Sequence, residues 1–171
     1  SDPYTVNKAL MVVPNACMVT VDTPTNSNIV VWERPFSNSI ASYFVYKESH
    51  QANVYNKVAT FAYPDLSVWA DFNSNPAQRA DRYRISLLDT CGVESPMSEP
   101  HKTMHVTAST GTSGENNLIW SHYEGFPFAT YHIYRGTSPD SLVLLDSIQS
   151  NLKSYTDLNP PSGVVFYRVT V

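Results

Sequence analysis

Charged residues are scarce in this sequence, and neither sign dominates. Asp, Glu, Lys and Arg together make up 15% of its 171 residues, and the net charge is −4. Because proteins that bind nucleic acid neutralise its phosphates with clustered Lys and Arg, this composition argues against a nucleic-acid partner. Apolar residues make up 42% of the chain, which is enough to bury a core and is not the composition of a disordered protein.

Long apolar runs are missing as well. The longest uninterrupted run covers residues 9–13, whereas a helix that spans a membrane needs about 20 predominantly apolar residues. The sequence therefore predicts no membrane span.

Cysteine occurs only twice, as Cys17 and Cys91. A pair of cysteines in a β-rich chain predicts one disulfide, which would imply an oxidising compartment. The bridge would close a loop of about 75 residues, for which chain entropy gives at most roughly 4 kcal/mol. The alternative is a pair of free thiols in a cytosolic protein.

One short phrase occurs twice. Residues 42–49 read "SYFVYKES" and residues 130–137 read "TYHIYRGT", so two Tyr, a β-branched residue between them and a basic residue after them recur in the same places. The same offset of 88 residues maps Trp32 onto Trp120. We infer that one ancestral unit is present twice.

The rest of the repeat follows with slightly smaller offsets. Asp71 matches Asp157 at an offset of 86, and Tyr83 matches Tyr167 at an offset of 84. Loops of unequal length in the two copies would produce this drift. The match therefore extends from the second expected strand to the sixth.

Side chains alternate between apolar and polar with a period of two, which predicts short, half-buried strands. The runs are β-branched or aromatic, are separated by Asn, Pro, Ser and Asp, and show no helical period. An all-β fold made of two-sheet sandwiches is the natural architecture. The residues expected in the core are Trp32, Tyr43, Val45, Trp69, Tyr83, Ile85, Trp120, Tyr131, Ile133, Tyr155, Tyr167 and Val169.

These motifs resemble fibronectin type III domains. The resemblance rests on a Trp in the second strand, Y-x-[VI]-Y in the third, "SYTDLNPP" at the fifth strand and Y-R-[VI]-x-[VL] in the sixth. The resemblance covers residues 15–171. The motifs resemble more closely still the tandem modules found in large secreted surface proteins of Bacteroidota-type bacteria. The resemblance implies two tandem immunoglobulin-like sandwiches, a secreted or cell-surface location, and hydroxyl bonds from Tyr83 and Tyr167 back to the preceding loop.

The expected boundaries are a lead segment over residues 1–14, a first module over 15–102 and a second module over 103–171. The lead segment is interpreted either as the end of a preceding module or as a spare strand. No Gly/Ser spacer separates the two modules, so we expect a semi-rigid junction. The second module departs from the family pattern because it lacks the last strand, and its open edge could accept residues 5–13 of another molecule in a strand-exchanged oligomer.

Several local patterns could indicate chemistry, but each favours an ordinary explanation. His101 and His105 are four residues apart, which on a strand is about 13 Å and too far to bind one metal ion. Residues 71–76 begin like a calcium loop but have Pro where Gly is needed, and residues 109–115 lack the Lys-Ser/Thr ending of a phosphate loop. Ser141 and Ser147 each follow an Asp, as in a short O-glycosylation motif, although exposed turns explain this equally well.

No catalytic, metal or cofactor site is therefore predicted. The main hypothesis is a non-catalytic structural or interaction module that spaces or docks the other modules of a larger secreted or cell-surface protein. The alternative is a module that binds carbohydrate or protein through exposed aromatics on a sheet face, with Phe44, Tyr46 and Tyr134 as candidates. An enzymatic role would belong to a longer parent protein of which this chain is an accessory part.

Overall fold

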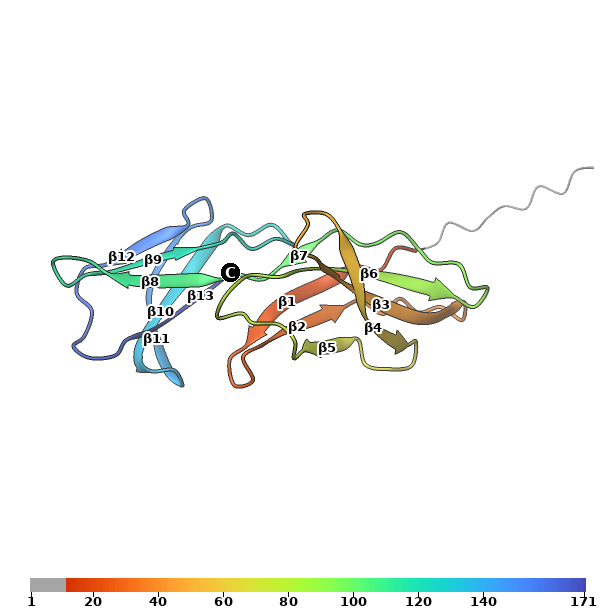
Figure 1. Cartoon of the computed structure of the whole chain (residues 1–171), viewed down its shortest axis with the longest axis horizontal. Helices are drawn as coiled ribbons and strands as arrows, with labels where there is room; N and C mark the ends of the chain where they lie inside the picture. The colour runs from red at the N-terminus through yellow and green to blue at the C-terminus, as the bar shows by residue number, and fades with distance from the viewer. Residues whose placement is uncertain (1–11) are drawn as a thin grey trace, which may run out of the picture.

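The computed structural model describes residues 12–171, which form two β-sandwiches one after the other. Figure 1 shows them lying end to end along the long axis. Most of the expected lead segment over 1–14, and most of the strand-exchange segment over 5–13, lie outside the described residues. The first strand begins at Ala16, shortly after the end of the expected lead segment.

Seven strands of the described chain build the first sandwich. They are β1 (Ala16–Asp22), β2 (Ser27–Trp32), β3 (Ile40–Glu48), β4 (Tyr55–Ala62), β5 (Val68–Asp71), β6 (Arg82–Asp89) and β7 (His101–Lys102). One sheet has the order β1-β2-β5 and the other the order β4-β3-β6-β7. The hairpin between β1 and β2 turns through Asn26, whose φ of 49° is in the left-handed region that Asn tolerates better than most residues.

Six strands of the described chain build the second sandwich. They are β8 (Val106–Thr110), β9 (Asn116–Trp120), β10 (Thr130–Ser138), β11 (Ser141–Gln149), β12 (Ser154–Asp157) and β13 (Phe166–Thr170). The sheets have the orders β12-β9-β8 and β11-β10-β13. Among the described residues no strand lies beside β13 in the place that β7 takes beside β6. The prediction of two tandem fibronectin type III-like sandwiches in an all-β chain is confirmed.

No helix of the described chain has the length and apolar character needed to cross a membrane.

Each sandwich is built around a tryptophan between its two sheets. Trp32 lies 6.1 Å from Tyr43 and Trp120 lies 5.4 Å from Tyr131, measured between ring centroids. Both pairs are buried, so indole and phenol rings supply much of the apolar area that stabilises each core. Of the residues expected in the core, the structure buries Trp32, Tyr43, Val45, Tyr83, Ile85, Trp120, Tyr131, Ile133 and Val169.

The other three expected core residues are only partly buried. Trp69, Tyr155 and Tyr167 pack against the two cores without being enclosed by them. All three lie on edge strands: Trp69 on β5, Tyr155 on β12 and Tyr167 on β13. A strand at the edge of a sheet has a neighbour on one side only, so its side chains stay partly open to solvent.

The structure corrects the disulfide prediction. Cys17 and Cys91 are both free and exposed. Cys17 lies on β1 where the pairing register with β2 shifts between Ala16 and Met18, and both Cys17 and Met18 are exposed there. Cys91 lies in the turn after β6, where its N–H donates to Asp89 Oδ1 at 2.9 Å. The argument for an oxidising compartment that rested on this disulfide is therefore lost.

Candidate functional site

A buried polar group lies where the two sheets of the first sandwich meet. Tyr83 on β6 donates its hydroxyl proton to Asp71 Oδ2 at 2.7 Å and accepts a bond from Asn28 Nδ2 at 3.0 Å. Asp71 ends β5, and its Oδ1 accepts the N–H of Asn73 at 3.1 Å in the turn that follows. The Tyr83 hydroxyl thus ties β6 to the start of the preceding loop, as the resemblance implied. Burial raises the pKa of this hydroxyl well above its ordinary value.

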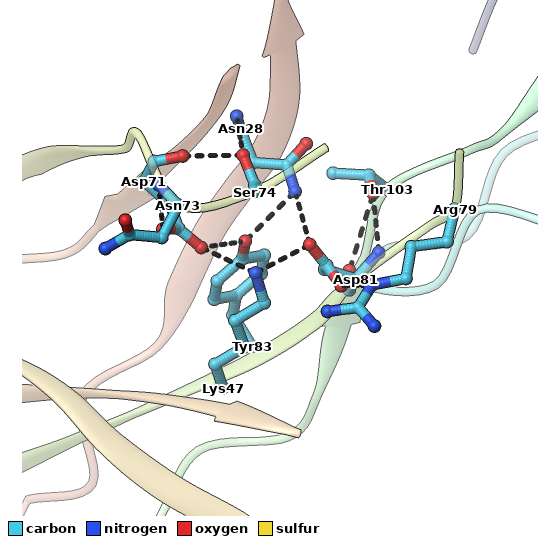
Figure 2. Close-up of polar contacts among 9 residues, drawn as sticks. All are labelled: Asn28, Lys47, Asp71, Asn73, Ser74, Arg79, Asp81, Tyr83 and Thr103. Atoms are coloured by element: carbon cyan, nitrogen blue, oxygen red, sulfur yellow. Dashed lines mark hydrogen bonds and ion pairs between the residues drawn. The ribbon is translucent and has the colours of Figure 1, made fainter. Parts of the chain in front are cut away.

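Lys47 adds a cation to this group, as Figure 2 shows. Its Nζ lies 2.8 Å from Asp71 Oδ2 and 2.7 Å from Asp81 Oδ2. The three side chains are 12%, 3% and 5% exposed, so the ammonium and both carboxylates are largely removed from water. Burying charges is costly unless they are paired and hydrogen-bonded, and here each charge has a partner of opposite sign.

Asp81, which immediately precedes β6, has further partners. Its Oδ1 accepts from Arg79 Nε at 2.9 Å and its Oδ2 from Asn28 Nδ2 at 3.1 Å. Its backbone N–H donates to Thr103 Oγ1 at 3.0 Å. Thr103 lies just after β7, so the group connects the first sandwich to the start of the second. We call Asn28, Lys47, Asp71, Asp81 and Tyr83 the corner cluster.

The second sandwich repeats part of the corner cluster. Tyr167 donates to Asp157 Oδ2 at 2.7 Å and accepts from Asn116 Nδ2 at 2.9 Å. Arg135 takes the place of Lys47, and its Nη1 donates to both carboxylate oxygens of Asp157 at 2.9 Å. Burial works against ionisation of Asp157, but the bonds from Arg135 and Tyr167 outweigh it and lower the pKa of the carboxyl. Among the described residues of this sandwich, no second carboxylate joins Asp157 at Arg135.

The corner cluster gives no sign of binding a substrate. Three surface cavities, of about 360, 480 and 200 Å³, are lined by residues outside the cluster. Within residues 12–171, no group of three or more His, Cys, Asp or Glu side chains could hold a metal ion. His101 is buried on β7, whereas His105 bonds the backbone oxygen of Ala77 at 3.0 Å through its Nε2. The two histidines therefore have separate surroundings.

The junction between the sandwiches is the second notable region. Tyr123, from the loop between β9 and β10, is 4% exposed and belongs to the hydrophobic core of the first sandwich. Its ring centroid is 6.3 Å from that of His101 and 4.8 Å from that of Phe126. Gly125 has a φ of 151°, and a Cβ at this position would run into the His101 ring. The loop of the second module thus fits closely against the first.

Ion pairs surround this apolar contact. Arg82 on β6 donates through Nη2 to Glu124 Oε1 at 2.7 Å and through Nη1 to Glu48 Oε2 at 2.9 Å. Lys102 donates its backbone N–H to the Glu124 carbonyl at 2.8 Å. The hydrogen bonds from Arg82 lower the pKa of the Glu124 carboxyl, and burial lowers the pKa of His101. One arginine of the first module therefore joins a carboxylate from each module.

The structure also corrects the expectation of an exposed aromatic face. Phe44 and Tyr46 are only 8% and 9% exposed. Lys57 Nζ lies 3.2 Å above the Phe44 ring centroid, and the Tyr46 hydroxyl donates to Glu94 Oε1 at 2.7 Å. The segment after β6 folds back along the edge of β6, where Glu94 pairs with Leu88, and the Glu94 side chain reaches over this face to accept bonds from Tyr46 and Ser86. Burial, together with the bond to Glu94, raises the pKa of Tyr46 to about 12.

The remaining candidates lie on the second module. Tyr134 is partly buried and lines a cavity of about 480 Å³ together with Pro139, Asp140, Leu142, Arg168 and Thr170. It does not join Phe44 and Tyr46, which lie on the other module. Ser141 and Ser147 are exposed on the edge strand β11, and Ser147 Oγ lies 2.8 Å from His132 Nδ1.

Sequence reasoning found Tyr83 and Asp71 of the corner cluster through the repeat, but it missed Asn28, Lys47 and Asp81 and the residues of the junction. The basic residue that recurs in the repeated phrase, Lys47 in one copy and Arg135 in the other, was a usable signal for the corner cluster. Asp81 has no counterpart in the second copy, and Tyr123 lies in a loop, so neither stood out from the pattern. Only the fold brings Tyr123 and Arg82 to the same junction.

No family model matches the chain, and no curated protein matches it. Among solved structures, similarity is found to a fibronectin type III-like protein from Clostridium thermocellum, with 18% identity over 56% of this chain and 93% of that one and a TM-score of 0.47. A two-domain fibronectin type III segment of chicken tenascin has 15% identity over 91% of this chain and 87% of that one, with a TM-score of 0.37.

A pectate lyase from Pectobacterium carotovorum is also similar, with 16% identity, a TM-score of 0.40 and coverage of 54% of this chain. This chain spans only 26% of the lyase. Identities and TM-scores this low transfer no activity, substrate or partner from any of these proteins.

Proposed function

We propose that this chain is a non-catalytic spacer or docking segment of a larger secreted or cell-surface protein. Its two sandwiches are held at a preferred angle, so that parts attached to either end keep a defined separation and orientation. The partners are other modules of the same polypeptide or neighbouring surface proteins. The sequence motifs support a parent of the kind found in Bacteroidota-type bacteria.

The observation that carries this proposal is the junction. Tyr123 of the second module completes the core of the first, and Arg82 bonds Glu48 of its own module and Glu124 of the other. A flexible linker would show neither buried aromatic contacts nor shared ion pairs across the boundary. The contacts therefore favour a junction that transmits orientation.

The structure counts against the alternative of a carbohydrate-binding face, because two of the three candidate rings are buried. Stacking on a sugar requires exposed rings, and Phe44 and Tyr46 are buried, with the side chains of Lys57 and Glu94 against them. The spacer function does not depend on any exposed ring.

Solution X-ray scattering tests the proposal. The unaltered chain should fit one elongated arrangement of two sandwiches, whereas Tyr123→Ala should require a distribution of interdomain angles, because it removes the ring shared by both modules. Tyr55→Ala is the matched control, because Tyr55 is partly buried on β4 and lies outside both hydrophobic cores.

A broad distribution of angles for the unaltered chain would contradict the proposal. So would an unchanged distribution for a folded Tyr123→Ala variant.

A further inference from the structure

The corner cluster of the first module holds an amine and two carboxyl groups in direct contact. Lys47 Nζ lies 2.8 Å from Asp71 Oδ2 and 2.7 Å from Asp81 Oδ2, and all three side chains are largely buried. Asp71 ends β5 in one sheet, whereas Lys47 is on β3 in the other. A covalent bond between Lys47 and Asp71 would therefore join the two sheets of the sandwich.

We propose that Lys47 and Asp71 condense to form an intramolecular isopeptide bond. The Lys47 Nζ attacks Asp71 Cγ, a new N–C bond forms, and the bond from Cγ to one carboxylate oxygen breaks. Of the three protons on the ammonium, one stays on the amide nitrogen and two leave with that oxygen as water. Atoms and charge balance because an ammonium and a carboxylate become a neutral amide and water, and no oxidant or other reactant is needed.

The surroundings of the two groups favour this reaction. The reacting groups are already in contact, because Lys47 Nζ lies 2.8 Å from an oxygen of the carboxyl group that it would attack, and both side chains are largely shielded from water. Two groups held in contact also react as if at very high concentration, with effective molarities of up to about 10⁵–10⁸ M in well-oriented intramolecular cases. The condensation replaces a buried ammonium and a buried carboxylate with a neutral amide, and so removes two charges from the interior of the protein.

The neighbours of the pair have suitable roles. Asp81 Oδ2 lies 2.7 Å from Lys47 Nζ, so it is placed to accept a proton from the amine, while Arg79 Nε holds the other oxygen of Asp81 at 2.9 Å. The Tyr83 hydroxyl donates to Asp71 Oδ2 at 2.7 Å and can supply a hydrogen bond to the oxygen that leaves. Asn28 Oδ1 is buried and finds no hydrogen-bond partner among the described residues, so an acceptor is available in the cluster where the new amide N–H forms.

The second module provides an internal comparison. Arg135 occupies the position of Lys47 and bonds Asp157 through Nη1, but the described chain shows no second carboxylate there. A guanidinium stays protonated in proteins, so it is not a nucleophile for a carboxyl carbon. The reaction is therefore assigned to the first module alone.

Intact mass spectrometry of the purified, folded chain tests the inference. The mass should be lower than the sequence mass by one water molecule, and digestion should yield a branched peptide that joins Lys47 to Asp71. Lys47→Arg should show the full sequence mass, because it keeps the positive charge in the arrangement that the second module already uses. Asp81→Asn should slow the loss of water, so that the fraction with the full sequence mass is increased after purification.

A full sequence mass for the unaltered chain would overturn the inference. A loss of water that persists in Lys47→Arg, or that digestion locates elsewhere, would overturn it too. These outcomes are independent of the spacer proposal, because that proposal depends on the junction and the scattering experiment tests it without any reference to mass.

Discussion

The two modules share one design at their corners but differ in how much charge they bury. In both, an Asn, a Tyr and an Asp are linked by hydrogen bonds between the two sheets, and a basic residue neutralises the Asp. The first module uses Lys47 between two carboxylates, whereas the second uses Arg135 against Asp157 alone. The shared part suffices to close a sandwich, so the additional Asp81 and its bond to Thr103 serve the first module and its junction.

The modules also differ in how their cores are completed. The first has a four-stranded sheet and a core that includes Tyr123 from its neighbour, whereas the second has three strands in each sheet among the described residues. Tyr123 of the second module joins the core of the first, whereas no described residue of the first module joins the core of the second. The first module should therefore depend on the second more than the second depends on the first.

The largest expected difference follows from removal of the basic residue. Lys47→Ala leaves two buried carboxylates with neither a shared cation nor a bond to Lys47, and it should lower the free energy of unfolding of the first module by at least about 3–5 kcal/mol. Arg135→Ala leaves one carboxylate and should cost the second module about 1–3 kcal/mol. Hydrogen exchange of peptides from β6 and β13, measured against denaturant, reports each module separately. Equal losses in the two modules would contradict the difference in buried charge.

A smaller difference is expected from removal of the tyrosine hydroxyls. Tyr83→Phe leaves Asp71 and Asn28 short of one partner in a fully buried setting and should cost about 1–3 kcal/mol. Tyr167 is only partly buried, so water can replace part of its bonding and Tyr167→Phe should cost less. Urea unfolding of the two variants provides the test, and a larger loss for Tyr167→Phe would show that the second corner is the stronger one.

Acid should weaken the junction between the two modules. The folded state lowers the pKa of His101, so the unfolded or undocked chain binds more protons and the stabilisation is lost as pH falls below about 6.5. The pKa of the Glu124 carboxyl is also lowered, which adds a second loss of stability as pH falls below the ordinary Glu pKa of about 4.3. Scattering curves recorded from pH 7 to pH 5 should show the interdomain angles broaden.

The matched variant for this effect is His101→Asn, which carries no titrating ring. Its interdomain angles should not change between pH 7 and pH 5. If they broaden as much as those of the unaltered chain, the titration of His101 is not the cause.

The smallest effect is expected at the cysteines. Cys17 and Cys91 are free and exposed, so neither module depends on a covalent bridge between them. Cys17→Ser and Cys91→Ser should each change the free energy of unfolding by less than about 0.5 kcal/mol, and a reductant should leave the melting temperature unchanged. A clear loss of stability in reductant would show that a disulfide forms in solution.

The repeat was the part of the structure that sequence reasoning could predict well. Trp32 and Trp120 recur at one offset, and a period of two assigns each its inward face, which is enough to place both between their sheets. The periodicity says which face of a strand a residue occupies but not what covers that face. Phe44 and Tyr46 were therefore assigned to an exposed surface, although both are buried, with Lys57 over the Phe44 ring and the Glu94 side chain bonded to the Tyr46 hydroxyl.

The sites were less predictable for a related reason. Lys47 and Arg135 stood in the repeated phrase, but the partners of Lys47 come from β5 and from the segment before β6, and the partner of Arg135 comes from β12. Only the folded chain brings these residues together. The cysteine prediction was wrong because the count of cysteines carries no information about side-chain direction, and Cys17 points to solvent on β1. Tyr123 had no matching residue in the other copy, so the repeat was silent about the junction.

The central claim is that the two sandwiches behave as one body because Tyr123 and Arg82 join them. Residual dipolar couplings of backbone amides in both modules of the unaltered chain at neutral pH test this most directly. The account predicts that one alignment tensor fits the couplings of β1–β7 and β8–β13 together, with the relative orientation seen in Figure 1. Two tensors of clearly different magnitude would show that the modules reorient independently and would contradict it.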